Sequence, residues 1–259
     1  MKYILISFIV SCLLSITPLL KPEATKKMVA KKLEVPVLCY HRIRNSLPSD
    51  GKNMRAYSVT PAHFAQQMKA LHDNGFHTIL PQQLHEYMVH NKSLPKNPVM
   101  ITFDDTREEH YRLGASEMKK YGFKGAFFIM TISINRPGYM TKTQIKTLSD
   151  NGNSIGVHTW DHNPVTKYKG TDWDIQLLKP KKLLESITGK PVNYFAYPSG
   201  IWNKTAIPKL RSNGYHLAFI LSTKSDPNEP LYTIRRIIVD GSLSSDGMLK
   251  TMKNTFNKK

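Results

Sequence analysis

The chain has 259 residues, of which 40% are hydrophobic, so it is long enough for one large domain with its own core. Its formal net charge is +18, and its lysines are dispersed along the sequence. Because no zinc-finger, helix-turn-helix or RNP-like segment accompanies this charge, it indicates attraction to anionic polymers or membrane surfaces. We therefore expect no nucleic-acid partner, and we expect an anionic cell-envelope surface as a candidate partner.

The amino terminus differs from the rest of the chain. One lysine precedes an apolar run over residues 3–20, and several lysines follow the run. This pattern is typical of an export signal, although the run is also long enough to span a bilayer. We expect residues 1–24 to be a signal peptide or membrane anchor, 25–34 a linker and 35–259 the folded domain. The protein would then be exported and either secreted, periplasmic or anchored outside the cytoplasm.

The chain contains only two cysteines, and Cys12 lies within the predicted signal, where cleavage, retention and lipidation all stay open. A processed chain would keep Cys39 alone, so it would form no internal disulfide and its core would have to stabilise the fold. Cys39 lies in an apolar segment, which favours a buried structural thiol over a nucleophile.

Short apolar strands alternate with amphipathic helical segments along the remaining chain. The predicted strands cover residues 35–40, 77–80, 99–103, 125–130, 154–157, 193–196, 217–221 and 233–239. The predicted helices cover residues 62–74, 81–91, 108–121, 141–151, 173–188 with an interruption at Pro180, and 204–213, and residues 44–55 are predicted to be a surface loop. The repeated β-then-α order predicts a parallel sheet, and about eight strands at this spacing predict closure into a single-domain (β/α) barrel.

Polar side chains follow several of these strands directly. Asp104 and Asp105 come after the third strand and His158 after the fifth, while His41 and the pair Tyr197-Pro198 follow two others. Catalytic residues of parallel α/β folds gather where the strands end at their carboxyl side. We therefore expect these residues to lie at one end of the barrel.

One carboxylate and two histidines form a ligand set that leaves open positions on a divalent metal for water and substrate. The spacing of His158 and His162 predicts two imidazoles on one side of a helical turn, which the Thr159 hydroxyl can hold. Adjacent aspartates reach one site only where a strand gives way to a loop. The carboxylate that does not bind the metal is then free to act as a base. The pattern indicates a metal-assisted hydrolase.

At this point the chain resembles a known family, the polysaccharide deacetylases, also called NodB-homology or carbohydrate esterase family 4 enzymes. The stretches that resemble its motifs are Thr102-Phe103-Asp104-Asp105, His158-Thr159-Trp160-Asp161-His162 and Phe195-Ala196-Tyr197-Pro198-Ser199-Gly200. Residues 35–43 resemble the opening strand of the subgroup that de-N-acetylates poly-β-1,6-N-acetylglucosamine. The resemblance covers residues 35–241 and implies a distorted (β/α) barrel of seven to eight strands. It also implies removal of N-acetyl groups from N-acetylglucosamine units of a cell-surface or extracellular polysaccharide, with release of acetate.

The resemblance further implies roles for individual residues. Asp104 would be the general base, and His41 would protonate the leaving amine, as the opening-strand histidine does in this subgroup. The metal, Zn²⁺ by default with Co²⁺, Ni²⁺ or Fe²⁺ as alternatives, would be held by Asp105, His158 and His162. The residues expected to line the groove and hold the oxyanion are Tyr197, Pro198 and Ser199, the last through its backbone N–H.

The chain also departs from the family pattern. Thr106 stands where the first motif usually has glycine, and Ala196 stands where an arginine often orients the base. Arg235 or Arg236 is the candidate replacement for that cation. The group Glu108, Glu109 and His110 is expected at the exposed start of a helix. Alternative functions are deacetylation of peptidoglycan or of an O-acetyl polysaccharide, and non-catalytic polysaccharide binding on the same fold.

Overall fold

The computed structural model describes residues 34–221 and 224–256, and these form one domain. The predicted signal or anchor and almost all of the predicted linker lie outside the described residues. Within them, no helix has both the length and the apolar character that crossing a bilayer requires.

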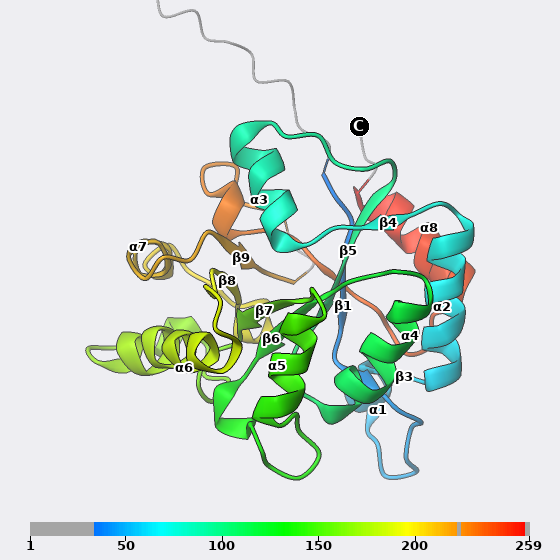
Figure 1. Ribbon diagram of the computed structural model, residues 1–259, viewed down its shortest axis with the longest axis horizontal. Coiled ribbons are helices and arrows are strands. Elements are labelled where there is room, and N and C mark those ends of the chain that lie inside the picture. The colour runs from blue at the N-terminus through cyan, green and yellow to red at the C-terminus, as the bar shows by residue number, and fades with distance from the viewer. Residues whose placement is uncertain (1–33, 222–223, 257–259) are drawn as a thin grey trace, which may run out of the picture. The chain divides into compact units, whose positions relative to one another are not determined.

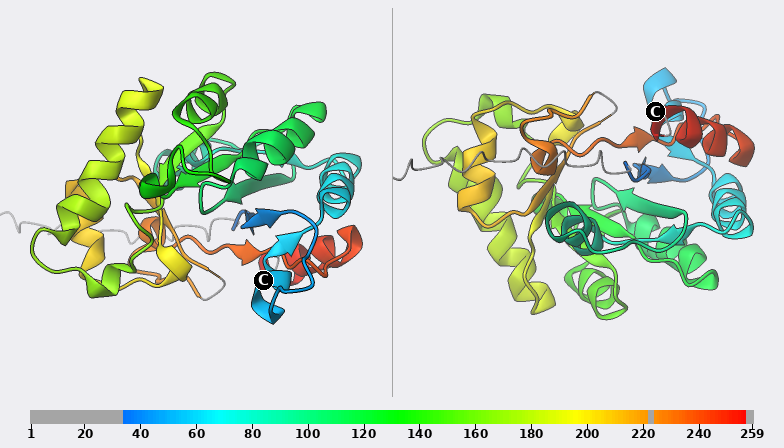
Figure 2. Two further views of the ribbon diagram at one scale, coloured as in Figure 1. Left: turned by 90° about the horizontal axis from the view of Figure 1, so that it is seen from below. Right: turned by 90° about the horizontal axis from the view of Figure 1, so that it is seen from above.

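Parallel strands occupy the centre of the domain and helices surround them (Figures 1 and 2). The order of neighbouring strands in the sheet is β10-β1-β5-β6-β7-β8-β9, with β4 paired to β5. Their bounds are β1 (Val37–Tyr40), β4 (His77–Thr78), β5 (Pro98–Phe103), β6 (Ala126–Ile129), β7 (Ser154–Val157), β8 (Tyr194–Ala196), β9 (Leu217–Phe219) and β10 (Ile237–Ile238). A separate short pair consists of β2 (Arg42–Ile43) and β3 (Ser58–Val59).

The segment that leads into β10 closes the sheet. Ile234 pairs with Phe219 of β9, and its N–H donates to the Ala218 carbonyl at 3.0 Å. Three residues later Ile237 pairs with Leu38 of β1. One stretch of chain therefore contacts both outer strands, and the predicted distorted (β/α) barrel is confirmed.

The helices cover the outside of this barrel and one of its ends. Their bounds are α1 (Lys52–Ala56), α2 (Pro61–Asp73), α3 (Pro81–His90), α4 (Ser116–Lys120), α5 (Lys142–Asp150), α6 (Lys179–Thr188), α7 (Ala206–Ser212) and α8 (Ser245–Phe256). Two π-helical segments, η1 (His110–Ala115) and η4 (Asp174–Leu178), lead directly into α4 and α6. Short 3₁₀ turns are η2 (Thr131–Ser133), η3 (Val165–Lys167), η5 (Pro198–Gly200) and η6 (Pro230–Tyr232).

Three predictions on these elements were wrong. Pro180 does not interrupt its helix, because it lies in the first turn of α6, where a missing N–H is tolerated. The predicted loop over residues 44–55 contains most of α1. The whole of α8 was missed, although Met248, Met252 and Phe256 recur every four residues and are buried. Figures 1 and 2 show α8 beside α2.

Side chains alternate between the two faces of each strand, which gives two cores. Leu38, Ile101 and Phe127 belong to the larger core, which the inner faces of α2, α5 and α6 complete. The intervening residues Val37 and Met100 belong to the smaller core, which fills the barrel interior. The same alternation along β1, β5 and β7 places His41, Asp104 and His158 on the interior side just after the strands end. Polar side chains therefore point inward at the carboxyl end of the barrel.

Gly156 in β7 has no side chain, and the ring of Phe128 occupies the space beside it. A Cβ at this position would lie 2.5 Å from Phe128 Cδ1 and 3.0 Å from the Tyr194 carbonyl oxygen. We expect Gly156→Ala to destabilise the fold by about 1–3 kcal/mol, the usual range for an overpacked core. Urea unfolding followed by tryptophan fluorescence measures this, with Gly51→Ala as the comparison, because the space beside Gly51 is open and its φ of −67° suits alanine. A Gly156→Ala variant as stable as wild type would contradict the expectation.

Candidate active site

The paired aspartates lie where β5 gives way to a loop, as the sequence predicted. Asp104 continues the interior register of the strand and is 1% exposed. Asp105 and Thr106 have φ values of +76° and +61°, and this left-handed turn brings the second carboxylate to the same side as the first. The conformation explains why glycine suits position 106. In this chain the Thr106 hydroxyl stabilises the turn by accepting a bond from the Met130 N–H at 2.7 Å.

The two histidines flank an irregular turn at the end of β7. The prediction of a helical turn was wrong, because Thr159 and His162 have φ values of +66° and +69°. The Thr159 hydroxyl does hold the segment, since it accepts a bond from the His162 N–H at 2.9 Å. His158 is buried, and its Nδ1–H donates to the Ala196 carbonyl at 2.8 Å. In the neutral ring this bond leaves the other nitrogen, Nε2, which faces the aspartates, with a free lone pair for a metal.

Three potential metal ligands converge at this point. Asp105 Oδ1 lies 3.4 Å from His158 Nε2 and 3.5 Å from His162 Nε2, and the three atoms are all within 4.8 Å of one another. Among the described residues, neither Asp105 Oδ1 nor His158 Nε2 has a hydrogen-bond partner, although both atoms are buried. Burying such atoms unpaired costs free energy, which a shared cation would remove. The residues therefore fit a divalent metal.

Each charge in this cluster alters the pKa of its neighbours. Burial alone would raise the pKa of Asp105, but His158, His41 and His162 lower it below its ordinary value. Burial likewise opposes protonation of His158, but Asp104 and Asp105 raise its pKa overall. The carboxylate of Asp105 is therefore ionised at neutral pH, which is the form that binds a metal.

A buried arginine orients Asp104. Arg236 Nη1 and Nη2 donate to the two carboxylate oxygens of Asp104, each at 2.7 Å, and both residues are at most 1% exposed. Burial opposes ionisation of Asp104, but the guanidinium and His158 lower its pKa to about 2. Of the two candidate arginines, Arg236 takes this position, whereas Arg235 forms an ion pair with Glu34 at the surface. Alternation along residues 233–239 decides between them, because Ile234 and Arg236 share the interior register.

His41 lies at the end of β1, beside the two aspartates. Its Nδ1 is 3.9 Å from Cys39 Sγ, and Cys39 is 3.6 Å from Asp104 Oδ2. The ring of Tyr57 packs against the His41 ring at a centroid distance of 4.8 Å. Burial lowers the pKa of His41, while the nearby aspartates oppose this effect. Cys39 is fully buried, as expected for a structural thiol, and its Sγ contacts the Asp104 carboxylate.

A clamp from the start of η1 holds the backbone on both sides of His41. His110 Nε2–H donates to the His41 carbonyl at 2.9 Å, and Glu109 accepts from Arg42 Nε at 2.6 Å and from the Ile43 N–H at 3.3 Å. His110 is fully buried, which lowers its pKa to about 4 and keeps it neutral. The expectation that Glu109 and His110 begin an exposed helix was therefore wrong. The sequence did not predict this clamp. The left-handed turn at Asp105 and Thr106 directs the following residues back toward residues 41–43, and the sequence pattern gave no sign of that turn.

Of the third motif, residues 195–200, only part lies where the sequence predicted. Tyr197 is fully buried and packs edge-on against Phe195 at 5.2 Å, so the prediction that its side chain lines the groove was wrong. Strand alternation explains this, because Phe195 and Tyr197 both face the helices. Pro198 is also buried, whereas Ser199 is exposed with φ +54° in the turn after β8. That turn follows Ala196, the partner of His158, so it lies at the same end of the barrel.

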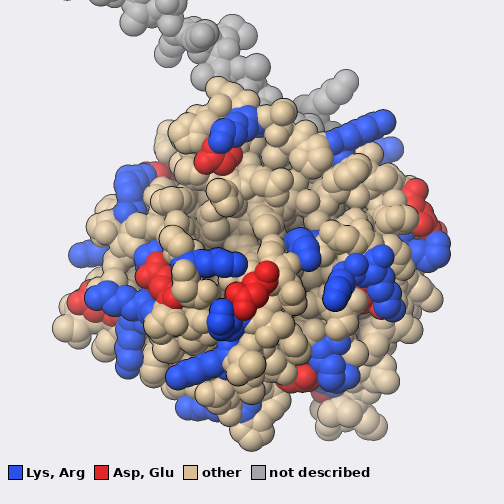
Figure 3. All heavy atoms as spheres, viewed as in Figure 1, with Lys and Arg blue, Asp and Glu red and all other residues tan. Residues whose placement is uncertain are grey.

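The surface charge is spread rather than concentrated. Figure 3 shows Lys and Arg side chains scattered over one face, with Asp and Glu between them. This distribution shows no concentrated basic patch on that face.

Two histidines, two aspartates and a buried arginine gather at the carboxyl end of the barrel. The fold and this cluster together are those of a β/α-barrel hydrolase.

Comparison with known proteins identifies the family. Residues 91–218 match the polysaccharide deacetylase family model. The poly-β-1,6-N-acetyl-D-glucosamine N-deacetylase of Staphylococcus aureus is 28% identical over 244 residues, covering 84% of this chain and 82% of that protein. The solved structure of IcaB from Ammonifex degensii is 26% identical with a TM-score of 0.70, over 85% of this chain and 96% of that one. The fold is also that of the Streptococcus pyogenes deacetylase PplD in complex with acetate, with a TM-score of 0.78 at 24% identity over 85% of this chain and 98% of that one.

The chain belongs to the polysaccharide deacetylase family, within the subgroup that resembles the poly-β-1,6-N-acetylglucosamine N-deacetylases. It is therefore a hydrolase of the deacetylase class.

Proposed function

We propose that this protein is a metal-dependent hydrolase that removes N-acetyl groups from N-acetylglucosamine units of a cell-surface or extracellular polysaccharide, with poly-β-1,6-N-acetylglucosamine as the first candidate. One observation carries the proposal: Asp105, His158 and His162 converge while the carboxylate of Asp104 lies beside them, 4.0 Å from His158 Nε2. The named activity of the Staphylococcus aureus relative supports the choice of polymer.

Asp105, His158 and His162 would hold the metal, for which Zn²⁺ is the first choice and Co²⁺, Ni²⁺ or Fe²⁺ are alternatives. When bound, such an ion lowers the pKa of water and polarises a carbonyl group. Asp104 accepts the proton of the attacking water, and Arg236 keeps both carboxylate oxygens in a fixed orientation. Because Arg236 also keeps Asp104 ionised, the base is in its reactive form at neutral pH.

The leaving amine needs a proton, and His41 is placed to donate it. The lowered pKa of His41 makes its protonated ring a stronger acid than free imidazole. The backbone N–H of Ser199 would stabilise the oxyanion, in the turn that follows β8. Acetate leaves, and the polymer gains an amine.

Removing the metal tests the reaction directly. We expect a chelator to reduce acetate release from N-acetylglucosamine oligomers to the level without enzyme, and Zn²⁺ to restore it. A panel of poly-β-1,6-N-acetylglucosamine, peptidoglycan and O-acetylated glycan, with acetate as the readout, assigns the substrate. Acetate release that a chelator leaves unchanged would refute metal dependence. A metal-loaded protein that releases no acetate from any of these glycans would instead be a polysaccharide-binding protein.

The clamp on His41 gives a further expected result. We expect Glu109→Ala to lower kcat about tenfold with little change in KM, because Arg42 and Ile43 lose their shared partner and His41 is no longer held in position. Metal content should stay at the wild-type level, since Glu109 contacts none of the three ligands. Glu117→Ala removes an ion pair at the surface of α4 and serves as the control. A fall in kcat that matches a loss of metal would contradict a role through His41.

We also propose that the protein is exported and acts outside the cytoplasm, secreted, periplasmic or membrane-anchored. The sequence of residues 1–24 and the net charge of +18 support this proposal. Cell fractionation of the full chain, compared with a chain that begins after residue 24, tests it. Equal amounts of the two proteins in the cytoplasm would contradict it.

A further inference from the structure

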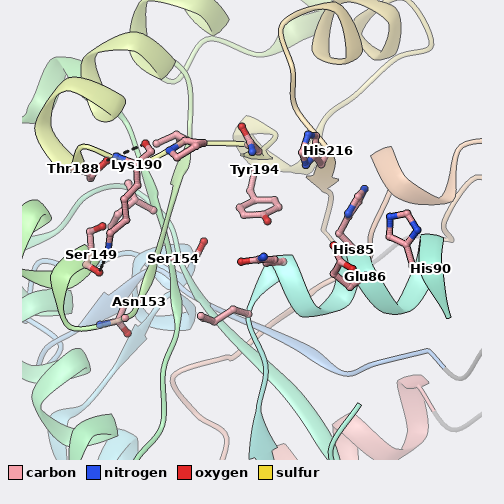
Figure 4. A pocket seen from close by; sticks show the side chains of 17 residues that line it. His85, Glu86, His90, Ser149, Asn153, Ser154, Thr188, Lys190, Tyr194 and His216 are labelled. Atoms are coloured by element: carbon pink, nitrogen blue, oxygen red, sulfur yellow. Dashed lines mark hydrogen bonds between the residues drawn. The ribbon is translucent and has the colours of Figure 1, made fainter. Parts of the chain in front are cut away.

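A hollow lies at the end of the barrel where the strands begin, opposite the end that holds the aspartates and His158. Its volume is about 720 Å³, within the range of about 300–1,000 Å³ that is usual for ligand sites. One side of α3 forms one wall, and the first residues of β7 and β8 and the segments that lead into β7, β8 and β9 form the others. Figure 4 shows Tyr194 in the middle, with three histidines on one side and Lys190, Ser149 and Asn153 on the other.

The charged groups in this hollow are already paired. Glu86 forms an ion pair of 2.7 Å with Lys92, and Lys190 Nζ donates to the Ser149 carbonyl at 2.7 Å. An anionic or cationic ligand would therefore have to compete with an existing partner.

The histidines do not form a metal site. The rings of His85 and His216 are stacked, with centroids 4.9 Å apart and an angle of 26° between their planes. Because the lone pairs of an imidazole lie in its ring plane, nearly parallel rings cannot direct them at one ion. Among the described residues, the groups whose ligand atoms converge lie at the opposite end of the barrel.

What the hollow offers is a set of neutral groups with unused hydrogen-bonding capacity. Within the described part of the chain, the Tyr194 hydroxyl, the Gln82 amide and the Ser154 hydroxyl form no hydrogen bond, and neither do the rings of His85 and His216. Burial raises the pKa of Tyr194 to about 12, so its hydroxyl stays protonated and can donate. Apolar surface beside these groups comes from Leu80 and Pro191.

We propose that this hollow is a second binding site for an uncharged saccharide. Hydroxyl and acetamido groups match neutral donors and acceptors, and the face of a pyranose ring matches an aromatic ring with apolar neighbours. The site is separate from the catalytic centre, because Ser154 and His158 lie at opposite ends of β7, about 13 Å apart along the strand. A long polymer can reach both ends around the outside of the barrel, whereas a short oligomer cannot. Only the link to the enzyme's own polymer rests on the proposed function.

A direct binding experiment tests the site. The full chain carrying Asp104→Asn, to prevent turnover, is titrated with the N-acetylglucosamine tetramer while the histidine ring signals are followed by NMR. We expect the signals of His85 and His216 to shift, and the affinity at this site to fall about fivefold or more with Gln82→Ala plus Ser154→Ala. Val89→Ser, at an exposed position of α3 outside the hollow, is the matched control and should leave the shifts unchanged. Absence of these shifts with the tetramer, with the longer polymer and with a peptidoglycan fragment would overturn the proposal.

Kinetics then separates the two sites. In the chain with Asp104 intact, Gln82→Ala plus Ser154→Ala should raise KM for the long polymer about fivefold while kcat, and acetate release from the tetramer, stay as in wild type. If the double variant and wild type had equal KM values for the long polymer, the hollow would not help to bind the substrate of the enzyme. Histidine shifts without any acetate release from wild type would refute the proposed function but support the saccharide site.

Discussion

The Asp104→Asn variant is expected to release acetate about 10²- to 10⁴-fold more slowly than wild type, the usual contribution of a general base. An amide has nearly the shape of a carboxylate but cannot accept the proton of the attacking water. The metal ligands of the proposed site, Asp105, His158 and His162, are unchanged in this variant. We therefore expect metal content, measured by plasma emission spectroscopy, to equal that of wild type.

A matched control separates loss of the base from loss of charge. Asp150→Asn removes a carboxylate that pairs with Lys146 at the exposed end of α5. We expect this control to retain full activity. Wild-type rates in the Asp104→Asn variant would refute the assignment of the base, and a parallel loss of metal would show that Asp104 acts mainly on the metal centre.

The largest effect on stability is expected at Arg236. We expect Arg236→Met to lower the free energy of unfolding by about 3–5 kcal/mol, because it leaves the buried carboxylate of Asp104 without its partner. Urea denaturation measures the difference. The double variant Arg236→Met/Asp104→Leu should recover most of it, since neither charge then remains. A double variant less stable than Arg236→Met alone would show that packing of the guanidinium, and not the charge pair, determines the loss.

The pH dependence of this difference has a definite sign. Asp104 has a pKa of about 2 in the folded protein against an ordinary value of 3.8, so its ion pair stabilises the fold fully above pH 4 and is lost as the pH falls towards 2. In Arg236→Met the guanidinium no longer lowers the pKa of Asp104, so burial, which raises this pKa, is opposed only by the nearby histidines. Protonation of Asp104 at low pH then removes part of the cost of burying an unpaired carboxylate. Measured with a chelator present, the gap between the two proteins should narrow as the pH is lowered from 7 to 3. A gap that widens would contradict this account.

Patterns local in the sequence predicted much of this protein. Apolar runs of four to six residues located the barrel strands, because a strand buried on both faces has no polar side. The position of Asp104, Asp105 and His158 after such runs predicted their convergence, since parallel strands end at one edge of the sheet.

Features that depend on distant contacts could not be predicted in the same way. Arg235 and Arg236 are chemically equal in the sequence, and only the register of the closing segment places Arg236 inside. The contact between His110 and the His41 carbonyl spans 69 residues and is a bond to backbone, which leaves no signal in side-chain chemistry. The buried position of Tyr197 follows from strand alternation, which the motif does not reveal.

Arg236, the partner of Asp104, lies directly before β10, the last strand of the barrel, and 132 residues after Asp104. During synthesis the growing chain therefore holds both aspartates and both histidines well before Arg236 leaves the ribosome. A premature stop after β9 would yield a polypeptide that has the complete set of proposed ligands but no cation to orient the carboxylate. In such a fragment β1 and β9 would also lack the segment that joins them. Under the proposed function, activity would therefore begin only after residues 234–238 have been synthesised and have closed the barrel.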